Sequence, residues 1–278
     1  MSGSWKFADR LQELSTERNS VLCLGLDPAL PRQRNKYIIP REYLINSDEN
    51  KARLKFCKDI LSLTADFCVA AKVNEQYLRG LTAEDHKELT KLIHDMEMLS
   101  IYDCKLGDIG DTVESAIFHI SEWGYDAITV NPLPGNLEWV VKIAHDREPS
   151  LGILVLTLMS NPESERFTKS VAVDGVPLYL MVAQDVRRYD ADGCVVGATG
   201  HVTGLDIRLV RETAGGDKVL LVPGIGAQMG DPEKVFRFGG RNVLVNVGRD
   251  IIYSEDPRRK AREWNNALND IKLKYAED

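Results

Sequence analysis

The stretch "LSIYDCKLGDIGDTVESAIFHISEWGYDAITV", residues 99–130, contains one complete strand–helix–strand unit. The runs at 99–105 and 126–130 are short and largely apolar, which is typical of strands buried on both faces of a parallel sheet. Between them, residues 112–123 place apolar side chains at three- and four-residue spacing, the pattern of an amphipathic helix. This stretch therefore predicts two parallel strands joined by a helix.

The same alternation extends over nearly the whole chain. We expect strands at 21–26, 67–73, 99–105, 126–130, 152–158, 193–198, 218–222 and 242–247. Helices are expected at 5–14, 53–65, 83–99, 112–123, 137–146, 177–189 and 257–275, with a further helix starting at 231.

Eight strand–helix units of this size and order predict an α/β fold, a (β/α)8 TIM barrel with an extra N-terminal helix. We expect a single barrel domain over residues 1–278. A doubly wound open sheet is the alternative, because periodicity alone does not prove that the sheet closes.

The composition excludes several classes of protein. A net charge of −7 argues against a general binder of nucleic acid or anionic membrane, and 44% hydrophobic residues indicate an ordinary globular chain. The N-terminus has no apolar signal segment, and no run approaches the length of a membrane span. We therefore predict a cytoplasmic protein with neither nucleic acid nor membrane as a partner. The five scattered cysteines contain no C-x-x-C pair, so we expect free thiols and no zinc site of that kind.

Polar residues follow the predicted strands at their carboxyl ends, where barrel enzymes place their catalytic groups. They are Asp27, Lys72, Asp103, Lys105, Asn131, Ser160, Thr199 and Arg249. Asp103 and Lys105 are two residues apart, so on an extended strand their side chains point to one face. With Asp108 they form a D-x-K-x-x-D motif, which alone is weak evidence because a surface ion pair has the same spacing. Its position at the end of an apolar strand favours a functional site.

A glycine-rich loop, "LVPGIGAQMGDPE", follows the seventh strand at residues 221–233. Gly224 and Gly226 lie between a buried strand and a helix start, where free backbone N–H groups favour a phosphate. The loop nearly matches the dinucleotide fingerprint, but Met229 takes the third glycine position and only one strand follows. We therefore do not expect NAD.

The stretch "NVGRD", residues 246–250, follows the eighth strand. Gly248 would supply a backbone donor and Arg249 a bidentate cation for the same phosphate. Barrels often bind phosphate between the loops after strands seven and eight, so the two loops together predict a phosphate site.

With these residues in place, the sequence resembles the orotidine 5′-monophosphate decarboxylase family. The resemblance rests on eight motifs in order: "LCLGLDP", "AAKVNEQY", "DCKLGDIGDT", "AITVNP", "LVLTLMSNPESERF", "VVGAT", "LVPGIGAQMGD" and "NVGRDIIYSEDP". It implies a homodimer of (β/α)8 barrels without cofactor or metal, which converts orotidine 5′-monophosphate to UMP and CO2 in the last step of de novo UMP synthesis.

The resemblance also implies catalytic roles. Lys105 would stabilise a carbanion-like intermediate at pyrimidine C6 and protonate it. Asp103 would lie beside the substrate carboxylate and hold Lys105, and Lys72 would belong to the same alternating array of charges. Asp108 would complete the array across the dimer interface.

Substrate contacts are implied as well. Thr112 would reach across the interface to the ribose, Asp27 and Lys72 would bind ribose hydroxyls, and Ser160 would bind the pyrimidine. The phosphate would be held by Gln228, Gly248 and Arg249. Further substrate contacts are implied for Ile109, Pro223 and Gly226.

Two other functions are open at this stage. A magnesium-dependent sugar-phosphate decarboxylase or aldolase of the same superfamily would typically carry a metal-binding glutamate where this chain has Lys72, which repels a divalent cation. A catalytically silent nucleotide-binding barrel would have no use for Lys105 with its flanking aspartates.

Some single residues also have alternative roles. Asp27 and Ser160 could have ordinary turn roles, and His201 is left unassigned. Residues 28–50 are either a surface excursion near the site or a tolerated insertion.

Overall fold

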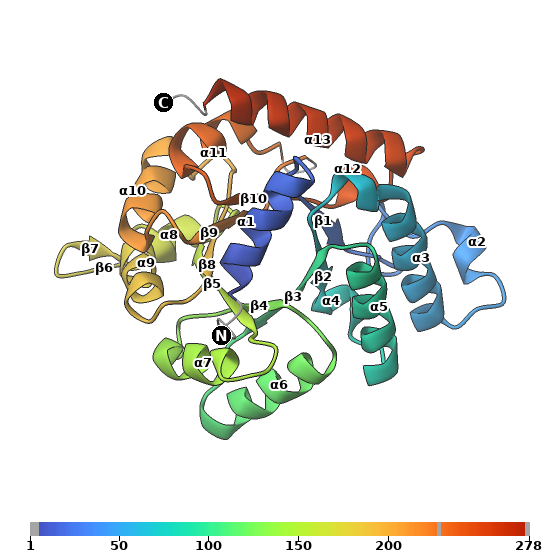
Figure 1. Cartoon of the computed structure of the whole chain (residues 1–278), viewed down its shortest axis with the longest axis horizontal. Coiled ribbons are helices and arrows are strands. Elements are labelled where there is room, and N and C mark those ends of the chain that lie inside the picture. The colour runs from blue at the N-terminus through green and yellow to red at the C-terminus, as the bar shows by residue number, and fades with distance from the viewer. Residues whose placement is uncertain (1–5, 227–228, 276–278) are drawn as a thin grey trace.

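The computed structural model describes residues 6–226 and 229–275. Eight parallel strands close into a barrel in the order β1-β10-β9-β8-β5-β4-β3-β2, so the predicted barrel is confirmed and the open sheet is excluded (Figure 1). The barrel strands are β1 (Leu22–Leu26), β2 (Ala70–Asn74), β3 (Leu99–Leu106), β4 (Ala127–Val130), β5 (Gly152–Leu158), β8 (Gly193–Val196), β9 (Val219–Val222) and β10 (Val243–Val247).

The longer helices surround the barrel, apart from the first. They are α1 (Phe7–Glu17), α3 (Glu49–Thr64), α5 (Ala83–Asp95), α6 (Gly110–Glu122), α7 (Leu137–His145), α9 (Leu178–Arg188), α10 (Gly204–Ala214), α11 (Pro232–Gly239) and α13 (Pro257–Lys274). The short elements are α2 (Arg41–Leu44), the 3-10 helix η1 (Ala65–Phe67), α4 (Glu75–Leu78), α8 (Ser164–Thr168), the hairpin strands β6 (Ala172–Val173) and β7 (Val176–Pro177), and α12 (Arg249–Ile252).

The sequence prediction missed α10 and most of the short elements. A signal for α10 was available, because Thr203 and Asp206 form a capping box in which each side chain accepts from the other residue's backbone N–H. The second strand begins at Ala70 rather than 67, because residues 65–67 form η1.

Helix α1 closes the amino-terminal end of the barrel. Its Phe7, Leu11 and Leu14 are buried in one cluster with inward-facing strand residues such as Leu154 and Leu244. The approach is so close that a Cβ on Gly152 would lie 2.5 Å from Phe7 Cβ. Figure 1 shows α1 lying across the barrel opening, so a ligand has to enter from the opposite end.

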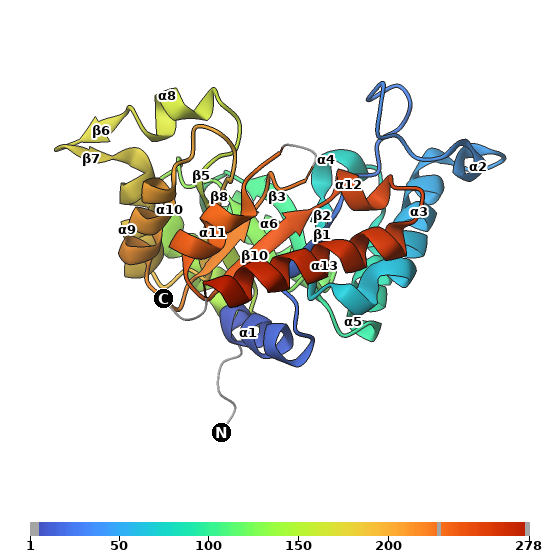
Figure 2. The same cartoon turned by 90° about the horizontal axis from the view of Figure 1, so that it is seen from above.

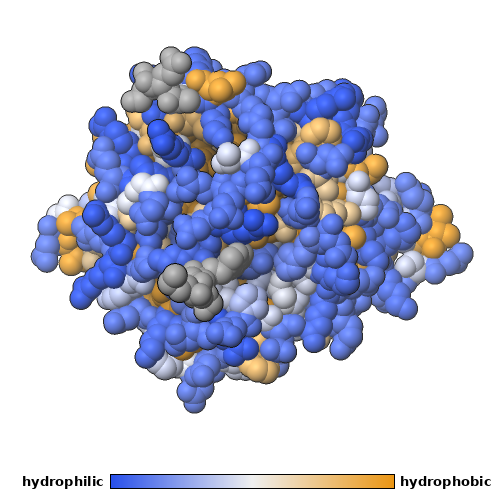
Figure 3. Space-filling view, in the orientation of Figure 1, coloured by the Kyte–Doolittle hydropathy of each residue, from blue (hydrophilic) through white to orange (hydrophobic). Residues whose placement is uncertain are grey.

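The two ends of the barrel differ in their surroundings. Figure 2 shows α1 on one side, and α8, the β6–β7 hairpin and the segment after β1 on the other. That segment, residues 28–50, is mostly exposed and holds α2, as expected for a surface excursion. The face that carries α1 is largely hydrophilic, with only scattered apolar side chains (Figure 3). Among the described helices, none has the length and apolar character needed to cross a membrane.

His86 on α5 is a buried titratable group outside the pocket described below. Its ring stacks on Trp123 with 4.5 Å between centroids, and its Nδ1 lies 2.9 Å from the Tyr125 hydroxyl. Burial lowers the pKa of His86 to about 4 from its usual 6.5. In the unfolded chain His86 therefore takes up a proton below about pH 6.5, whereas in the folded chain it stays neutral until about pH 4.

We predict that acid weakens the fold through His86. Between pH 7.5 and pH 5 the free energy of unfolding should fall by on the order of 2 kcal/mol from this group alone. His86→Gln should flatten that part of the pH profile, as measured by urea unfolding at several pH values. His119→Gln on α6, which changes an exposed histidine, serves as the control and should leave the profile steep. An equally steep profile in His86→Gln would contradict the assignment.

Candidate active site

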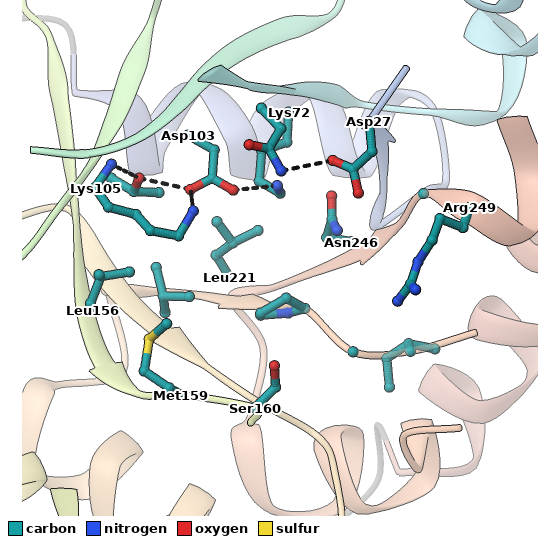
Figure 4. Close-up of a pocket in the computed structure, with 17 residues that line it drawn as sticks. Asp27, Lys72, Asp103, Lys105, Leu156, Met159, Ser160, Leu221, Asn246 and Arg249 are labelled. Atoms are coloured by element: carbon teal, nitrogen blue, oxygen red, sulfur yellow. Dashed lines mark hydrogen bonds and ion pairs between the residues drawn. The ribbon is translucent and has the colours of Figure 1, made fainter. Parts of the chain in front are cut away.

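A pocket of about 200 Å³ opens at the carboxyl ends of the barrel strands, where the sequence predicts the functional groups (Figure 4). It contains most of the candidate residues, brought together from separate strands. Those that line it are Asp27, Lys72, Asp103, Lys105, Ser160, Pro223, Gly248 and Arg249.

The inward-facing residues divide the pocket floor into a polar half and an apolar half. Strands β10, β2, β3 and β4 contribute the polar side chains Asn246, Lys72, Asp103 and Thr129. Strands β5, β8 and β9 contribute the apolar side chains Leu156, Val195 and Leu221. The apolar half keeps water away from one side of the charged groups, which strengthens their electrostatic effect on a bound molecule.

Asp103 links two lysines at the centre of the polar half. Its Oδ2 lies 2.6 Å from Lys72 Nζ and its Oδ1 lies 2.7 Å from Lys105 Nζ. Lys72 and Asp103 are buried, whereas the Lys105 side chain is 39% exposed toward the pocket. Both carboxylate oxygens are therefore paired, and the free face of the Lys105 ammonium is available to a ligand.

The charges in this array stabilise one another. Burial alone would lower the pKa of Lys72, but the carboxylates of Asp103 and Asp27 outweigh it and raise the pKa. Burial alone would raise the pKa of Asp103, but the ammonium groups of Lys72 and Lys105 hold that pKa well below its usual range. Lys72 and Asp103 therefore both stay ionised at neutral pH.

Strand β3 is irregular where it carries Lys105. Lys105 has a φ of 54°, in the left-handed region, and the register of β3 on β4 shifts between Tyr102 and Leu106. Asp103 and Lys105 both line the pocket and their side chains meet, but the backbone at Lys105 departs from the extended conformation that the two-residue spacing argument assumes. A bulge of this kind re-aims a side chain at the end of a strand.

Thr129 on β4 holds this irregular segment in place. Its Oγ1 accepts a hydrogen bond of 2.9 Å from the backbone N–H of Lys105 and donates one of 2.9 Å to Asp103 Oδ1. One hydroxyl thus fixes the backbone of the lysine and the carboxylate beside it. Sequence reasoning missed Thr129, whose only signal was an inward position on the strand next to β3.

Asp27 stands at the end of β1, on the other side of Lys72. Its Oδ1 accepts a hydrogen bond of 2.9 Å from Asn74 Nδ2, and its backbone carbonyl accepts one of 2.8 Å from the Tyr253 hydroxyl. Asn74 also lines the pocket and caps α4, accepting from the Gln76 N–H. The carboxylate of Asp27 therefore faces the pocket, which the turn alternative does not require.

The predicted phosphate end of the pocket is formed by the loops after β9 and β10. Pro223 and Gly224 meet Gly248 and Arg249 there, and Gly224 has a φ of 94° that favours glycine. Among the described residues no carboxylate forms an ion pair with Arg249, whose guanidinium lies 5.9 Å from the ring centre of Tyr37 in the 28–50 excursion.

Of the other residues of the glycine-rich loop, Gln228 lies outside the described residues, and Met229 is 91% exposed. Gly226 belongs to the loop but does not line the pocket.

Three other candidates lie outside the pocket of their own chain. Asp108, Ile109 and Thr112 are exposed at the start of α6. The Asp108 carboxylate accepts from the Ile109 N–H at 2.8 Å, and its backbone carbonyl accepts from Asn136 Nδ2 at 3.0 Å. The loops after β3 and β4 are thereby tied together, with these three side chains turned outward.

Ser160 and His201 occupy the loops opposite the charged array. Ser160 lines the pocket, and its carbonyl accepts from the Thr199 hydroxyl. His201 lies outside the pocket, where its Nε2 is 3.1 Å from Ser164 Oγ and its carbonyl accepts from Lys169 Nζ at 2.9 Å. His201 therefore joins the segment around α8 to the loop after β8.

Metal-ligating side chains do not gather in this pocket or elsewhere in residues 6–226 and 229–275, where no group of three His, Cys, Asp or Glu is placed to hold an ion. The lysines of the array contribute positive charge in the place where a divalent cation would need carboxylates.

Comparison with known proteins yields consistent matches. The profile of the "Orotidine 5′-phosphate decarboxylase / HUMPS family" matches residues 20–264. An orotidine 5′-phosphate decarboxylase of Cupriavidus metallidurans is 34% identical over 257 residues, covering 89% of each chain. The structure of Leishmania donovani OMP decarboxylase is 26% identical with a TM-score of 0.76, covering 97% of this chain and 100% of that one. The Plasmodium berghei enzyme, 22% identical with a TM-score of 0.79 over 97% and 99% of the two chains, shares the fold.

Proposed function

The chain belongs to the orotidine 5′-phosphate decarboxylase / HUMPS family, and from that premise we propose that it converts orotidine 5′-monophosphate to UMP and CO2. The observation that carries this proposal is the Lys72–Asp103–Lys105 array at one end of a pocket whose other end presents Arg249. A nucleotide with its phosphate on Arg249 and Gly248 would extend its base toward Lys105 and Ser160, with the ribose over Asp27 and Lys72.

In the proposed reaction the bond between C6 and the carboxylate carbon breaks and leaves its electron pair on C6. The ammonium of Lys105 stabilises this charge and then transfers a proton to C6, so that UMP and CO2 leave and neutral Lys105 regains its proton from solvent. Two unit charges about 4 Å apart interact by roughly 4 kcal/mol at an effective dielectric constant of 20. Asp103 pairs with the Lys105 ammonium and orients it, and the apolar half of the pocket favours neutral CO2 over its charged carboxylate precursor.

We further propose that the working unit is a homodimer in which Asp108 and Thr112 complete the partner's pocket. Their exposed positions outside their own pocket support this arrangement. Two large apolar side chains of the same linked loops, Ile109 and Leu133, are 63% and 66% exposed, as expected for a surface that a second copy covers. Cytoplasmic location stays a prediction.

The decisive experiment measures CO2 release from carboxyl-labelled orotidine 5′-monophosphate by the purified protein, with and without EDTA. We expect release that the chelator leaves unchanged, since the proposed chemistry uses no metal or organic cofactor. Release lost in EDTA and restored by magnesium would contradict the metal-free chemistry, and a sugar-phosphate enzyme of the same family would release no CO2 from this substrate. Tight UMP binding without CO2 release would favour a silent binding protein.

Thr129→Val tests how far the proposed reaction depends on the position of Lys105. The change removes the acceptor for the Lys105 N–H and the donor to Asp103 while keeping the shape of the side chain. We expect kcat to fall roughly 10- to 100-fold, because loss of one hydrogen bond to a charged group costs about 1.5–3 kcal/mol. Affinity for UMP should change little. Thr129→Ser restores the hydroxyl and should recover most of kcat, and equal losses in both variants would contradict the assigned role.

A further inference from the structure

Asn246 is a polar pocket residue that the proposed reaction has not used. It lies on β10, lines the pocket and pairs in register with Cys23 of β1. Its Oδ1 is buried, yet within residues 6–226 and 229–275 that atom has no hydrogen-bond partner. Buried polar atoms in folded proteins are nearly always hydrogen-bonded, so an unpaired amide oxygen beside a ligand pocket points to a ligand group.

The strand geometry places this amide between two proposed parts of the site. Side chains two residues apart on a strand share a face, and Leu244 belongs to the cluster inside the barrel, so Asn246 lies above it at the pocket floor. Gly248 and Arg249 follow at the rim. Figure 4 shows Asn246 between the lysine–aspartate array and Arg249, below Asp27.

Gly25 on β1 confines the amide. A Cβ at Gly25 would lie 3.0 Å from Asn246 Oδ1 and 3.0 Å from Gly248 Cα, so the two strands approach here as closely as a bare backbone allows. With β1 packed against one side, the Asn246 side chain has little room to turn, and the residue also lines the pocket.

The chemistry of the amide selects its partner. The nearby lysine and arginine groups only donate hydrogen bonds, and the carboxylates of Asp27 and Asp103 only accept them, whereas an asparagine amide does both. A phosphate offers acceptors alone and would leave Oδ1 unpaired, but a sugar hydroxyl both donates and accepts. We infer that Asn246 binds a ribose hydroxyl of the nucleotide. This inference rests on the proposed function, since it takes the ligand to be a ribonucleotide.

The test compares two ligands and two proteins. Dissociation constants for UMP and for 2′,3′-dideoxy-UMP, which lacks both ribose hydroxyls, are measured by calorimetry for the native protein and for Asn246→Ala. We expect the change to weaken UMP binding roughly 10-fold and dideoxy-UMP binding less than about 2-fold, because only UMP carries the hydroxyl that loses its partner. Equal weakening of both ligands would mean that Asn246 only supports the pocket, and no weakening would mean that water satisfies the amide; either result overturns the inference.

Two controls keep the result interpretable. Asn242→Ala removes an asparagine that precedes the same strand and donates to the Gly216 and Asp217 carbonyls outside the pocket, so it should leave both affinities unchanged. Asn246→Val repeats the test with a filled side chain in case the alanine variant folds poorly. CO2 release is measured separately on the native protein. If UMP binding depends on the hydroxyls and on Asn246 but no CO2 is released, this inference stands and decarboxylation is refuted. If CO2 is released but UMP binding does not depend on the hydroxyls and Asn246, decarboxylation stands and this inference is refuted.

Discussion

Lys105→Ala should abolish decarboxylation while leaving nucleotide binding largely intact. The lysine is proposed to stabilise the charge at C6 and to supply its proton, and these two contributions together are worth at least about 10⁴-fold in kcat. Binding should survive, because Arg249, Gly248 and Asp27 are untouched and the half-exposed Lys105 side chain contributes little to the core. We therefore expect no measurable CO2 release, with UMP affinity within about 10-fold of the native value.

The matched control is Lys91→Ala on α5. Lys91 is also a lysine paired with one aspartate, its Nζ lying 2.6 Å from Asp95, but it is exposed and far from the pocket lining. It should retain full activity, since exposed ion pairs contribute about 0–1 kcal/mol to stability. Near-normal turnover by Lys105→Ala would refute the role assigned to this lysine.

Mixing two inactive variants should restore activity if the site is shared between subunits. An Asp108→Ala chain lacks the group proposed to act in the partner's pocket, and a Lys105→Ala chain lacks its own catalytic lysine. Each alone should be nearly inactive. In a heterodimer one site carries both changes and the other carries neither, so random exchange of equal amounts should recover about a quarter of native activity.

Subunit exchange has to be verified independently, for example with one chain tagged and co-purified. If heterodimers form and activity does not return, Asp108 does not act across an interface. Asp111→Ala, which changes an exposed carboxylate in the first turn of α6, three residues after Asp108, is the matched control and should be active without mixing.

Several features of this protein follow from local sequence alone. The alternation of apolar runs with amphipathic segments predicts the strand–helix units of the barrel, because a strand buried on both faces and a helix buried on one leave different periodicities. The charged residues of "DCKLGDIGDT" and the glycines of the two loops are neighbours in the chain. Predicting that these residues lie at strand ends required only the strand boundaries. The largest error in those boundaries was at β2, which begins at Ala70 rather than at residue 67.

Which other side chains reach the pocket depends on how the strands pair in the closed barrel. Thr129 and Asn246 are single polar residues in apolar strands more than a hundred residues apart, and nothing in their neighbourhood distinguishes an inward from an outward position until the strands are paired. In the folded chain Asp108 lies outside its own pocket, and the backbone at Lys105 adopts the left-handed conformation. Local sequence sets which chemical groups a strand carries, but the direction of each group depends on register and bulges, which arise from contacts between strands.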